Sequence, residues 1–225
     1  MSKEMNRREF MKTSAAAGTG LVTGSVSLAF AEEKRAIQLL KPQAGSGNAL
    51  MQLLWKRTSS REFSPEPLPI EVLSNMLWAA FGISRPDGKR TAPTARNRQE
   101  IDIYVATAKS LYLYDAKANL LSPLLAEDIR GMTGGQPYVK DAPVNLIYVA
   151  DYSKMDKGAN EERVLFSAAA TGFISENVYL YCASEGLATV VRAMIDRPTL
   201  AREMKLQPDQ NILLAQSVGY PRRRS

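Results

Sequence analysis

The segment from Glu161 to Glu185 constrains the fold of this chain more than any other, because it predicts one long helix that ends at Gly186. Its apolar residues cover more than one helical stripe. A helix that is apolar nearly all round is buried on most of its sides, so the simplest interpretation is the centre of a core. The residues that carry this pattern are Leu165, Phe166, Ala168, Ala169, Thr171, Gly172, Ile174 and Val178.

Shorter elements surround this helix. Helices are predicted over 48–56, capped by Asn48, over 70–81, between Pro69 and Gly82, over 121–130, and over 196–205, capped by Asp196. Strands are predicted over 101–106 and 110–114, joined as a hairpin, and over 143–150, 189–191 and 211–218. The glycine-rich stretch 131–137 is predicted to be flexible. Helices mixed with mostly antiparallel strands predict an α+β fold, without repeats or a second domain.

The N-terminus carries a twin-arginine pattern over 6–12, followed by a weakly apolar stretch over 13–30 and the small residues Ala29 and Ala31. The pattern predicts a cleaved signal peptide over 1–31, an extended arm over 32–47 and one domain over 48–225. A membrane anchor is the alternative, but Gly18, Gly20 and Gly24 make the stretch too polar for a stable membrane span. Because the signal is of the twin-arginine type, we expect a periplasmic or otherwise exported protein. The twin-arginine route moves proteins that have already folded.

Missing residue types exclude several kinds of chemistry. The sequence has no histidine, which excludes a Ser-His-Asp triad, a Cys-His dyad and a histidine-ligated zinc or haem. Its single cysteine, Cys182, excludes intrachain disulfides and iron–sulfur clusters, and its apolar surroundings predict burial. The net charge of +6, of which residues 1–31 carry +2 (four basic against two acidic), is dispersed, so no nucleic-acid partner is expected. Any reaction must therefore run through a cofactor.

Two polar segments are the candidates for binding that cofactor. The first is Arg57-Thr58-Ser59-Ser60-Arg61, where two guanidinium groups and three hydroxyls lie within five residues. Forked, permanently charged arginine donors and hydroxyls suit a phosphate monoester, although such a cluster is also typical of a solvated helix end. The second segment, over 90–99, contains three more arginines and leads directly into the strand predicted over 101–106.

Together these segments resemble the FMN-dependent nitroreductase family, especially its branch of thiazoline-oxidase-like dehydrogenases. Arg57, Ser59 and Arg61 match the family's phosphate motif, and the stretch 92–99 is similar to its flavin loop, with Thr94 in place of the usual serine. Two further matches are the stretch 186–192 and the end of the last strand at 218–221. The resemblance implies FMN-binding residues at Arg57, Thr58, Ser59, Arg61, Pro93, Thr94, Ala95, Asn97, Gln99, Val191, Arg192, Arg222 and Arg223.

The same resemblance implies an intertwined homodimer, in which the long helix packs across a two-fold axis and flavin lies at the interface. It also implies two-electron transfer to a small-molecule substrate, such as a nitroaromatic or quinone-like acceptor, with NAD(P)H or another electron donor. Two alternatives remain. One is an exported protein that binds FMN without turnover, and the other is a dehydrogenase of a modified peptide or small molecule. No metal site and no catalytic side chain are indicated.

Overall fold

A computed structural model of the chain describes residues 49–222. The predicted signal peptide over 1–31, the arm over 32–47, the cap at Asn48 and the tail residue Arg223 all lie outside the described residues. No helix in the described part is long and apolar enough to cross a membrane.

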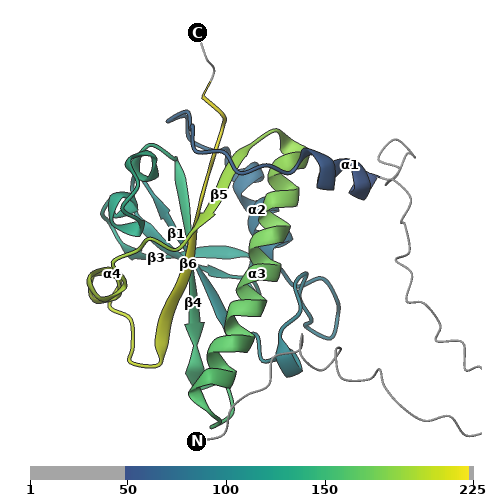
Figure 1. Ribbon diagram of the computed structural model, residues 1–225, viewed down its shortest axis with the longest axis vertical. Coiled ribbons are helices and arrows are strands. Elements are labelled where there is room, and N and C mark those ends of the chain that lie inside the picture. The colour runs from purple at the N-terminus through teal and green to yellow at the C-terminus, as the bar shows by residue number, and fades with distance from the viewer. Residues whose placement is uncertain (1–48, 223–225) are drawn as a thin grey trace, which may run out of the picture. The chain divides into compact units, whose positions relative to one another are not determined.

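The described domain is built on one six-stranded sheet (Figure 1). Its strands are β1 (Ile101–Thr107), β2 (Leu111–Asp115), β3 (Leu120–Leu125), β4 (Val144–Asp151), β5 (Ala188–Arg192) and β6 (Gln210–Gly219). They lie in the order β3-β2-β1-β4-β6-β5, and every neighbouring pair is antiparallel. The fully buried strand β4 lies near the centre, whereas β3 and β5 form the two edges. The hairpin predicted from strands over 101–106 and 110–114, joined at 107–109, is confirmed as the antiparallel pair of β1 and β2.

Helices cover the sheet, as the predicted α+β class requires. Helices α2 (Ile70–Phe81) and α3 (Asn160–Glu185) pack on one face, where Ile103, Tyr148 and Ile174 belong to the core. Helix α4 (Arg197–Glu203) packs on the opposite face, where Leu200 contributes to a second apolar cluster with Ile147. Because side chains alternate along a strand, β1 and β4 supply both clusters. Helix α1 (Ala49–Lys56) lies beside the C-terminal end of α3 (Figure 1).

The predicted helix ends are confirmed where local chemistry decides them. Pro69 precedes α2, and Gly82 follows it in extended conformation. Gly186 ends α3 at φ +67, a left-handed conformation that glycine adopts without a Cβ clash. The Asp196 carboxylate accepts a hydrogen bond from the Thr199 backbone N–H and so caps α4.

One predicted helix is wrong. Residues 120–125 form the edge strand β3, which pairs with β2 and places Tyr112 opposite Pro123. Proline is tolerated there because an edge strand has backbone groups that need no partner strand. The stretch that follows is also more regular than predicted, since two 3₁₀ turns over Arg130–Thr133 and Pro137–Lys140 replace the flexible segment. The helix prediction for residues 120–125 fails because pairing with β2, rather than local helix propensity, decides their conformation.

Helix α3 is buried on only part of its surface. Its inward side holds Ile174, Val178 and Cys182, so the predicted burial of Cys182 is confirmed, and this burial raises the pKa of its thiol to about 12. Its outward side leaves Leu165 65% exposed and Phe173 51% exposed, with Ala168, Ala169 and Gly172 between them. The prediction that this helix is buried on most of its sides is therefore wrong for the described chain, because only its inward side packs on the sheet.

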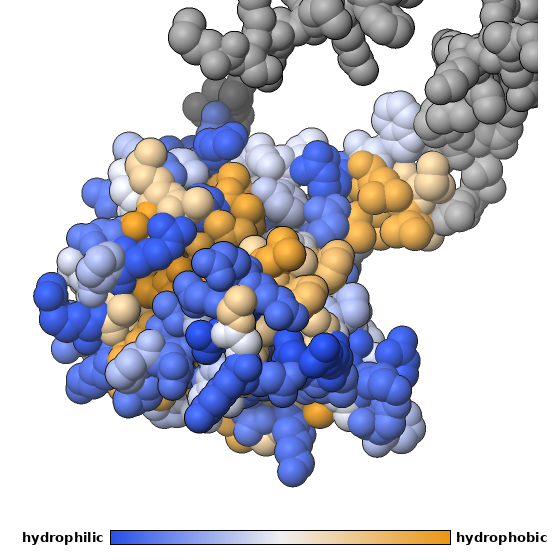
Figure 2. Space-filling view, turned by 60° about the horizontal axis from the view of Figure 1, so that its bottom comes forward, coloured by the Kyte–Doolittle hydropathy of each residue, from blue (hydrophilic) through white to orange (hydrophobic). Residues whose placement is uncertain are grey.

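Further apolar side chains are exposed on α1. Leu50, Leu54 and Trp55 are between 46% and 64% exposed. Figure 2 shows this hydrophobic surface at the point where the described chain begins, beside otherwise polar residues. Exposed apolar surface on two neighbouring helices is typical of a protein–protein contact.

Candidate functional site

The Arg57–Arg61 segment lies along the outer edge of the sheet. After α1 the chain runs beside β5, where the Ser60 backbone N–H donates to the Thr189 carbonyl oxygen at 2.9 Å. Farther on, Phe63 forms an isolated antiparallel bridge with Pro221, next to the end of β6. The backbone of this segment is therefore fixed to two strands, while Thr58, Ser59 and Arg61 stay exposed and Arg57 is half-buried.

Tyr179 of α3 joins this segment to β5. Its phenol oxygen lies 2.9 Å from the Ser59 hydroxyl and accepts a hydrogen bond from the Val191 backbone N–H at 2.9 Å. The Arg57 guanidinium lies over the Tyr179 ring, 5.4 Å from its centroid, within the range of a cation–π contact. Tyr179 thus contacts three of the predicted FMN-binding residues, Arg57, Ser59 and Val191, although the sequence did not predict a role for Tyr179 itself.

Arg192, also predicted to bind the cofactor, points inward. It is 5% exposed, and its guanidinium donates to Thr133, to the Asn145 side chain and to the Ser217 hydroxyl. Burial lowers the pKa of Arg192 to about 10. The guanidinium also passes close to Gly134, where a Cβ would lie 2.5 Å from Nη1. Its side chain therefore fixes the Gly131–Gly135 stretch to the sheet, and only its backbone faces the edge of β5.

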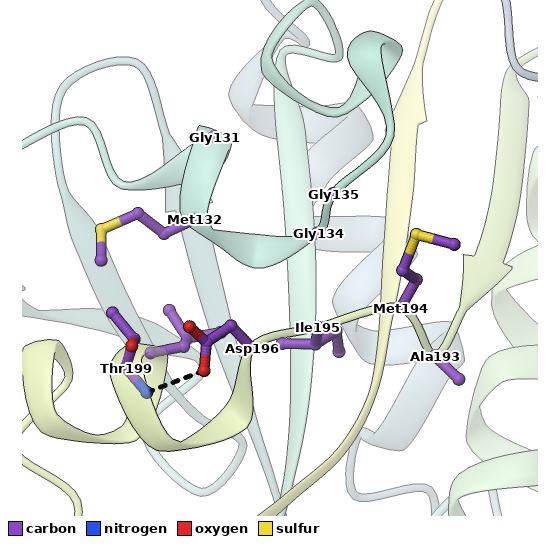
Figure 3. Close-up of a pocket in the computed structure, with 10 residues that line it drawn as sticks. Gly131, Met132, Gly134, Gly135, Ala193, Met194, Ile195, Asp196 and Thr199 are labelled. Atoms are coloured by element: carbon purple, nitrogen blue, oxygen red, sulfur yellow. Dashed lines mark hydrogen bonds between the residues drawn. The ribbon is translucent and has the colours of Figure 1, made fainter.

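A cleft of about 490 Å³ opens where β5 ends (Figure 3). One wall is the glycine-rich stretch with Met132, and the other is the segment from Ala193 to α4 with Met194 (Figure 3). The Gly135 backbone N–H donates to the Met194 carbonyl oxygen at 3.1 Å and holds the walls together. The lining residues are Gly131, Met132, Gly134, Gly135, Ala193, Met194, Ile195, Asp196, Thr199 and Leu200. Sequence reasoning missed this cleft because its glycines indicated only flexibility.

The second predicted segment forms a strained loop held by its own side chains. The Gln99 backbone N–H donates to the Thr94 hydroxyl, and the Gln99 amide donates to the Asn97 side chain. Arg96, Asn97 and Gln99 all have φ between 52 and 54. Non-glycine residues in this region cost about 1–3 kcal/mol each and cluster at binding sites. Pro93, Thr94 and Asn97 line a cleft of about 370 Å³, and Ala95 opens a short 3₁₀ turn.

Among the described residues, no hydrogen bond or ion pair joins these two segments. Arg96 and Arg98 pair with Asp156, which precedes the N-terminal end of α3, at 3.1 and 2.5 Å. Ser59 lies beside Tyr179 near the other end of that helix. The Ser167 hydroxyl lies 3.5 Å from the Met155 sulfur, so Asp156 lies beside the part of α3 around Ser167, and the helix from Ser167 to Tyr179 rises about 18 Å.

The C-terminal residue that the structure describes is tied down near the first segment. The Arg222 backbone N–H donates to the Glu62 carbonyl oxygen at 3.2 Å, and its guanidinium donates to the Phe63 carbonyl oxygen and to Asp141, each at 3.3 Å. The Arg222 backbone thus lies beside Glu62, the residue that follows Arg61. Its guanidinium already has the Asp141 carboxylate as a partner. No group of three metal-ligating side chains occurs within residues 49–222.

Comparison with known proteins identifies relatives over most of the chain. The Nitroreductase family model matches residues 54–220. A crystal structure from Ralstonia eutropha JMP134, provisionally named a nitroreductase, shares 44% identity and a TM-score of 0.75, covering 83% of this chain and 89% of that one. A protein of Methanocaldococcus jannaschii with the same provisional name is 28% identical over 151 residues, which are 63% of this chain and 76% of that protein. The NADPH:FMN oxidoreductase of Vibrio harveyi, solved with NAD+, shares the fold at 19% identity and TM-score 0.59, over 78% of this chain and 70% of that one.

Proposed function

Because the chain belongs to the nitroreductase family, we propose that it is an FMN-dependent oxidoreductase that passes two electrons to a small acceptor. The observation that carries the proposal is the position of the Arg57–Arg61 segment on the outer edge of β5, a strand that ends at the cleft beside Met194. An elongated ligand lying along β5 would have its phosphate at one end and the cleft at the other.

The residues at the phosphate end fit an FMN phosphate. Arg61 is exposed, and its side chain has no hydrogen bond or ion pair with another residue in the part of the chain described. Arg57 offers its guanidinium beside the Ser59 hydroxyl, with the Tyr179 ring beneath it. Two cations and a hydroxyl that have no anionic partner among residues 49–222 are the donor set that a phosphate monoester needs. The exposed Thr58 hydroxyl lies between them in the chain.

The cleft end fits a planar ring. Its lining is mostly apolar, with glycines, two methionines, Ile195 and Leu200, and its polar side chains are Asp196 and Thr199. The backbone of Val191 and Arg192 leads to this cleft, while the Arg192 guanidinium holds the glycine-rich wall in place. Bound FMN would supply the two-electron chemistry, and these residues would hold the ring and keep water from its covered face.

We further propose that two chains build each site as a homodimer. Within residues 49–222 the strained loop over 93–99 forms no hydrogen bond or ion pair with Arg57 or Ser59 of its own chain, and we assign it to the flavin of a partner copy. The exposed apolar sides of α1 and α3 supply the surface for that pairing. An obligate interface should bury more than about 2,000 Å² and be mainly apolar.

We also infer export by the twin-arginine route, supported by the sequence of residues 6–12. The electron donor is NAD(P)H or, because NAD(P)H is scarce outside the cytoplasm, another reductant of that compartment. Membership of the thiazoline-oxidase-like branch, and with it the modification of a peptide, stays a prediction.

Two measurements test the function. The purified protein should show a flavin absorbance band after incubation with FMN, and a colourless protein would remove the proposal. Anaerobic reduction followed by stopped-flow mixing with quinones and nitroaromatics should give acceptor-dependent reoxidation. Reoxidation no faster than that of free FMN would favour the alternative, a protein that binds FMN without turnover. Mixing with NADH and NADPH in the same apparatus identifies or excludes a nicotinamide donor.

The loop over 93–99 yields a testable prediction about the flavin potential. We expect Asn97→Gly to shift the FMN midpoint potential by about 10–30 mV, because a neutral side chain at the polar edge of the ring tunes the reduced form, and 30 mV is about 1.4 kcal/mol for two electrons. Glycine tolerates the positive φ of Asn97, so the variant removes the side chain without backbone strain. Asn119→Gly is the matched control, because Asn119 also has a positive φ but lies between β2 and β3, so this change should leave the potential unchanged. A shift below about 10 mV in Asn97→Gly would contradict the assignment.

The C-terminal arginines give a second prediction. Since Arg222 is already paired with Asp141, we expect Arg223→Ala to weaken FMN binding more than Arg222→Ala does. The effect should be about twofold to fivefold and should shrink as salt is raised, because exposed charges are screened. Titrations of both variants at low and high ionic strength measure it. Equal affinities and equal salt dependence would leave the tail without a role in the site.

A further inference from the structure

Tyr179 occupies a junction that the proposed function does not by itself explain. It projects from α3 to the outer edge of β5, where its phenol contacts Ser59 and Val191 and its ring contacts Arg57. These contacts link the helix, the edge strand and the phosphate-binding segment. Tyr179 thus contacts both Arg57 and Ser59.

The direction of the two phenol hydrogen bonds follows from their chemistry. The Val191 backbone N–H can only donate, so the phenol oxygen accepts that bond. The phenol proton then points to the remaining neighbour, the Ser59 oxygen 2.9 Å away. Once its oxygen has accepted this proton, Ser59 has its own proton free to donate to a ligand. Such a chain of bonds polarises each member and strengthens the last donor.

We propose that Tyr179 is a positioning residue that makes Ser59 a committed hydrogen-bond donor and holds Arg57 beside it, so that the site prefers a phosphorylated flavin to riboflavin. The inference rests on the proposed FMN site. An anion needs donors only, whereas a serine hydroxyl that rotates freely has two lone pairs and one proton to present. The ring under Arg57 adds to this by limiting the positions that the guanidinium adopts.

A purely structural role predicts a different pattern. The outer edge of β5 is already bonded through Ser60 and Thr189, so Tyr179 is not needed to cover that whole edge. If Tyr179 only supported β5, its loss would weaken FMN and riboflavin alike. If it acts through Ser59, its loss would affect only the ligand that carries a phosphate.

The test is a double-mutant cycle on the intact protein with FMN and riboflavin as ligands. The binding of each ligand is measured by the quenching of its fluorescence. We expect Tyr179→Phe to weaken FMN binding about threefold to tenfold and Ser59→Ala about tenfold or more, with riboflavin affinity unchanged in both. The double variant should resemble Ser59→Ala, because both changes remove the same interaction. Effects that multiply independently, or an equal loss of riboflavin affinity, would overturn the inference.

A second pair of variants separates the ring from the phenol. Tyr179→Leu removes both and should weaken FMN more than Tyr179→Phe, which keeps the surface under Arg57. In an Arg57→Ala background the two variants should bind FMN equally, since the ring then has no guanidinium to hold. A difference that persists in that background would overturn the part assigned to the ring. Wild-type protein that binds no FMN would instead overturn the proposed function and this inference together, which the first titration reveals.

Discussion

Phe173→Asp is expected to convert a flavin-loaded dimer into a monomer that no longer retains FMN. Phe173 is 51% exposed on the outward side of α3, among small residues that permit close helix approach. A two-fold interface carries each substitution twice, so the change places two carboxylates in an apolar contact. Burying an unpaired charge costs several kcal/mol, so the dimer dissociation constant should rise by at least about a hundredfold.

Light scattering coupled to size exclusion, with flavin absorbance recorded on the same peak, measures both effects. Ile70→Asp is the matched control, because Ile70 is 75% exposed but lies on α2, at the edge of a different groove. It makes the same apolar-to-acid change and should leave a yellow dimer. A flavin-loaded monomer, in either the wild type or Phe173→Asp, would contradict a site built from two chains.

The elements predicted correctly are those fixed by nearby residues. Gly186 and Asp196 mark helix ends because capping involves residues within one turn. The hairpin of β1 and β2 follows from alternation and a short connection, in which Thr107 bonds Ser110. Helix α3 was predicted almost to the residue because an apolar pattern of that length leaves few alternatives.

The failure at 120–125 has a physical origin in pairing. A leucine-rich stretch favours a helix on its own, and only the presence of β2 makes it a strand. The sequence nonetheless contained a signal for a turn just before this stretch. The Asp115 carboxylate accepts from the backbone N–H groups of Lys117 and Ala118, and Asn119 has φ 50, which together form a turn between two strands.

The candidate site likewise contains residues that the sequence predicts and residues that only the fold brings into it. Arg57, Ser59 and Arg61 were predictable because charges and hydroxyls gathered in five residues carry their meaning locally. Tyr179 was not, since it follows Ser59 by 120 positions and a tyrosine in an apolar helix indicates core. The inward direction of Arg192 was equally hidden, because it depends on acceptors at Thr133, Asn145 and Ser217 that only the fold brings together.

Arg57→Ala is expected to weaken FMN binding about tenfold to a hundredfold, because a charge-assisted hydrogen bond contributes about 1.5–3 kcal/mol. Among the described residues, the Arg57 guanidinium has the Tyr179 ring as its neighbour and no carboxylate partner, so its removal should act on the ligand rather than on the fold. The thermal midpoint of the FMN-free protein should therefore change little.

The neighbouring Lys56 separates a specific contact from general attraction. Lys56 is exposed at the end of α1 and carries the same charge one position away, so Lys56→Ala removes an equal charge without removing the guanidinium. If Arg57 binds the phosphate directly, Lys56→Ala should weaken FMN binding by less than about threefold, and that small effect should disappear at high salt because long-range attraction between exposed charges is screened. The Arg57→Ala effect should persist at high salt and should be absent with riboflavin, which has no phosphate. Equal losses in the two variants would mean that the segment attracts anions without holding one, and the assignment of the phosphate to Arg57 would be wrong.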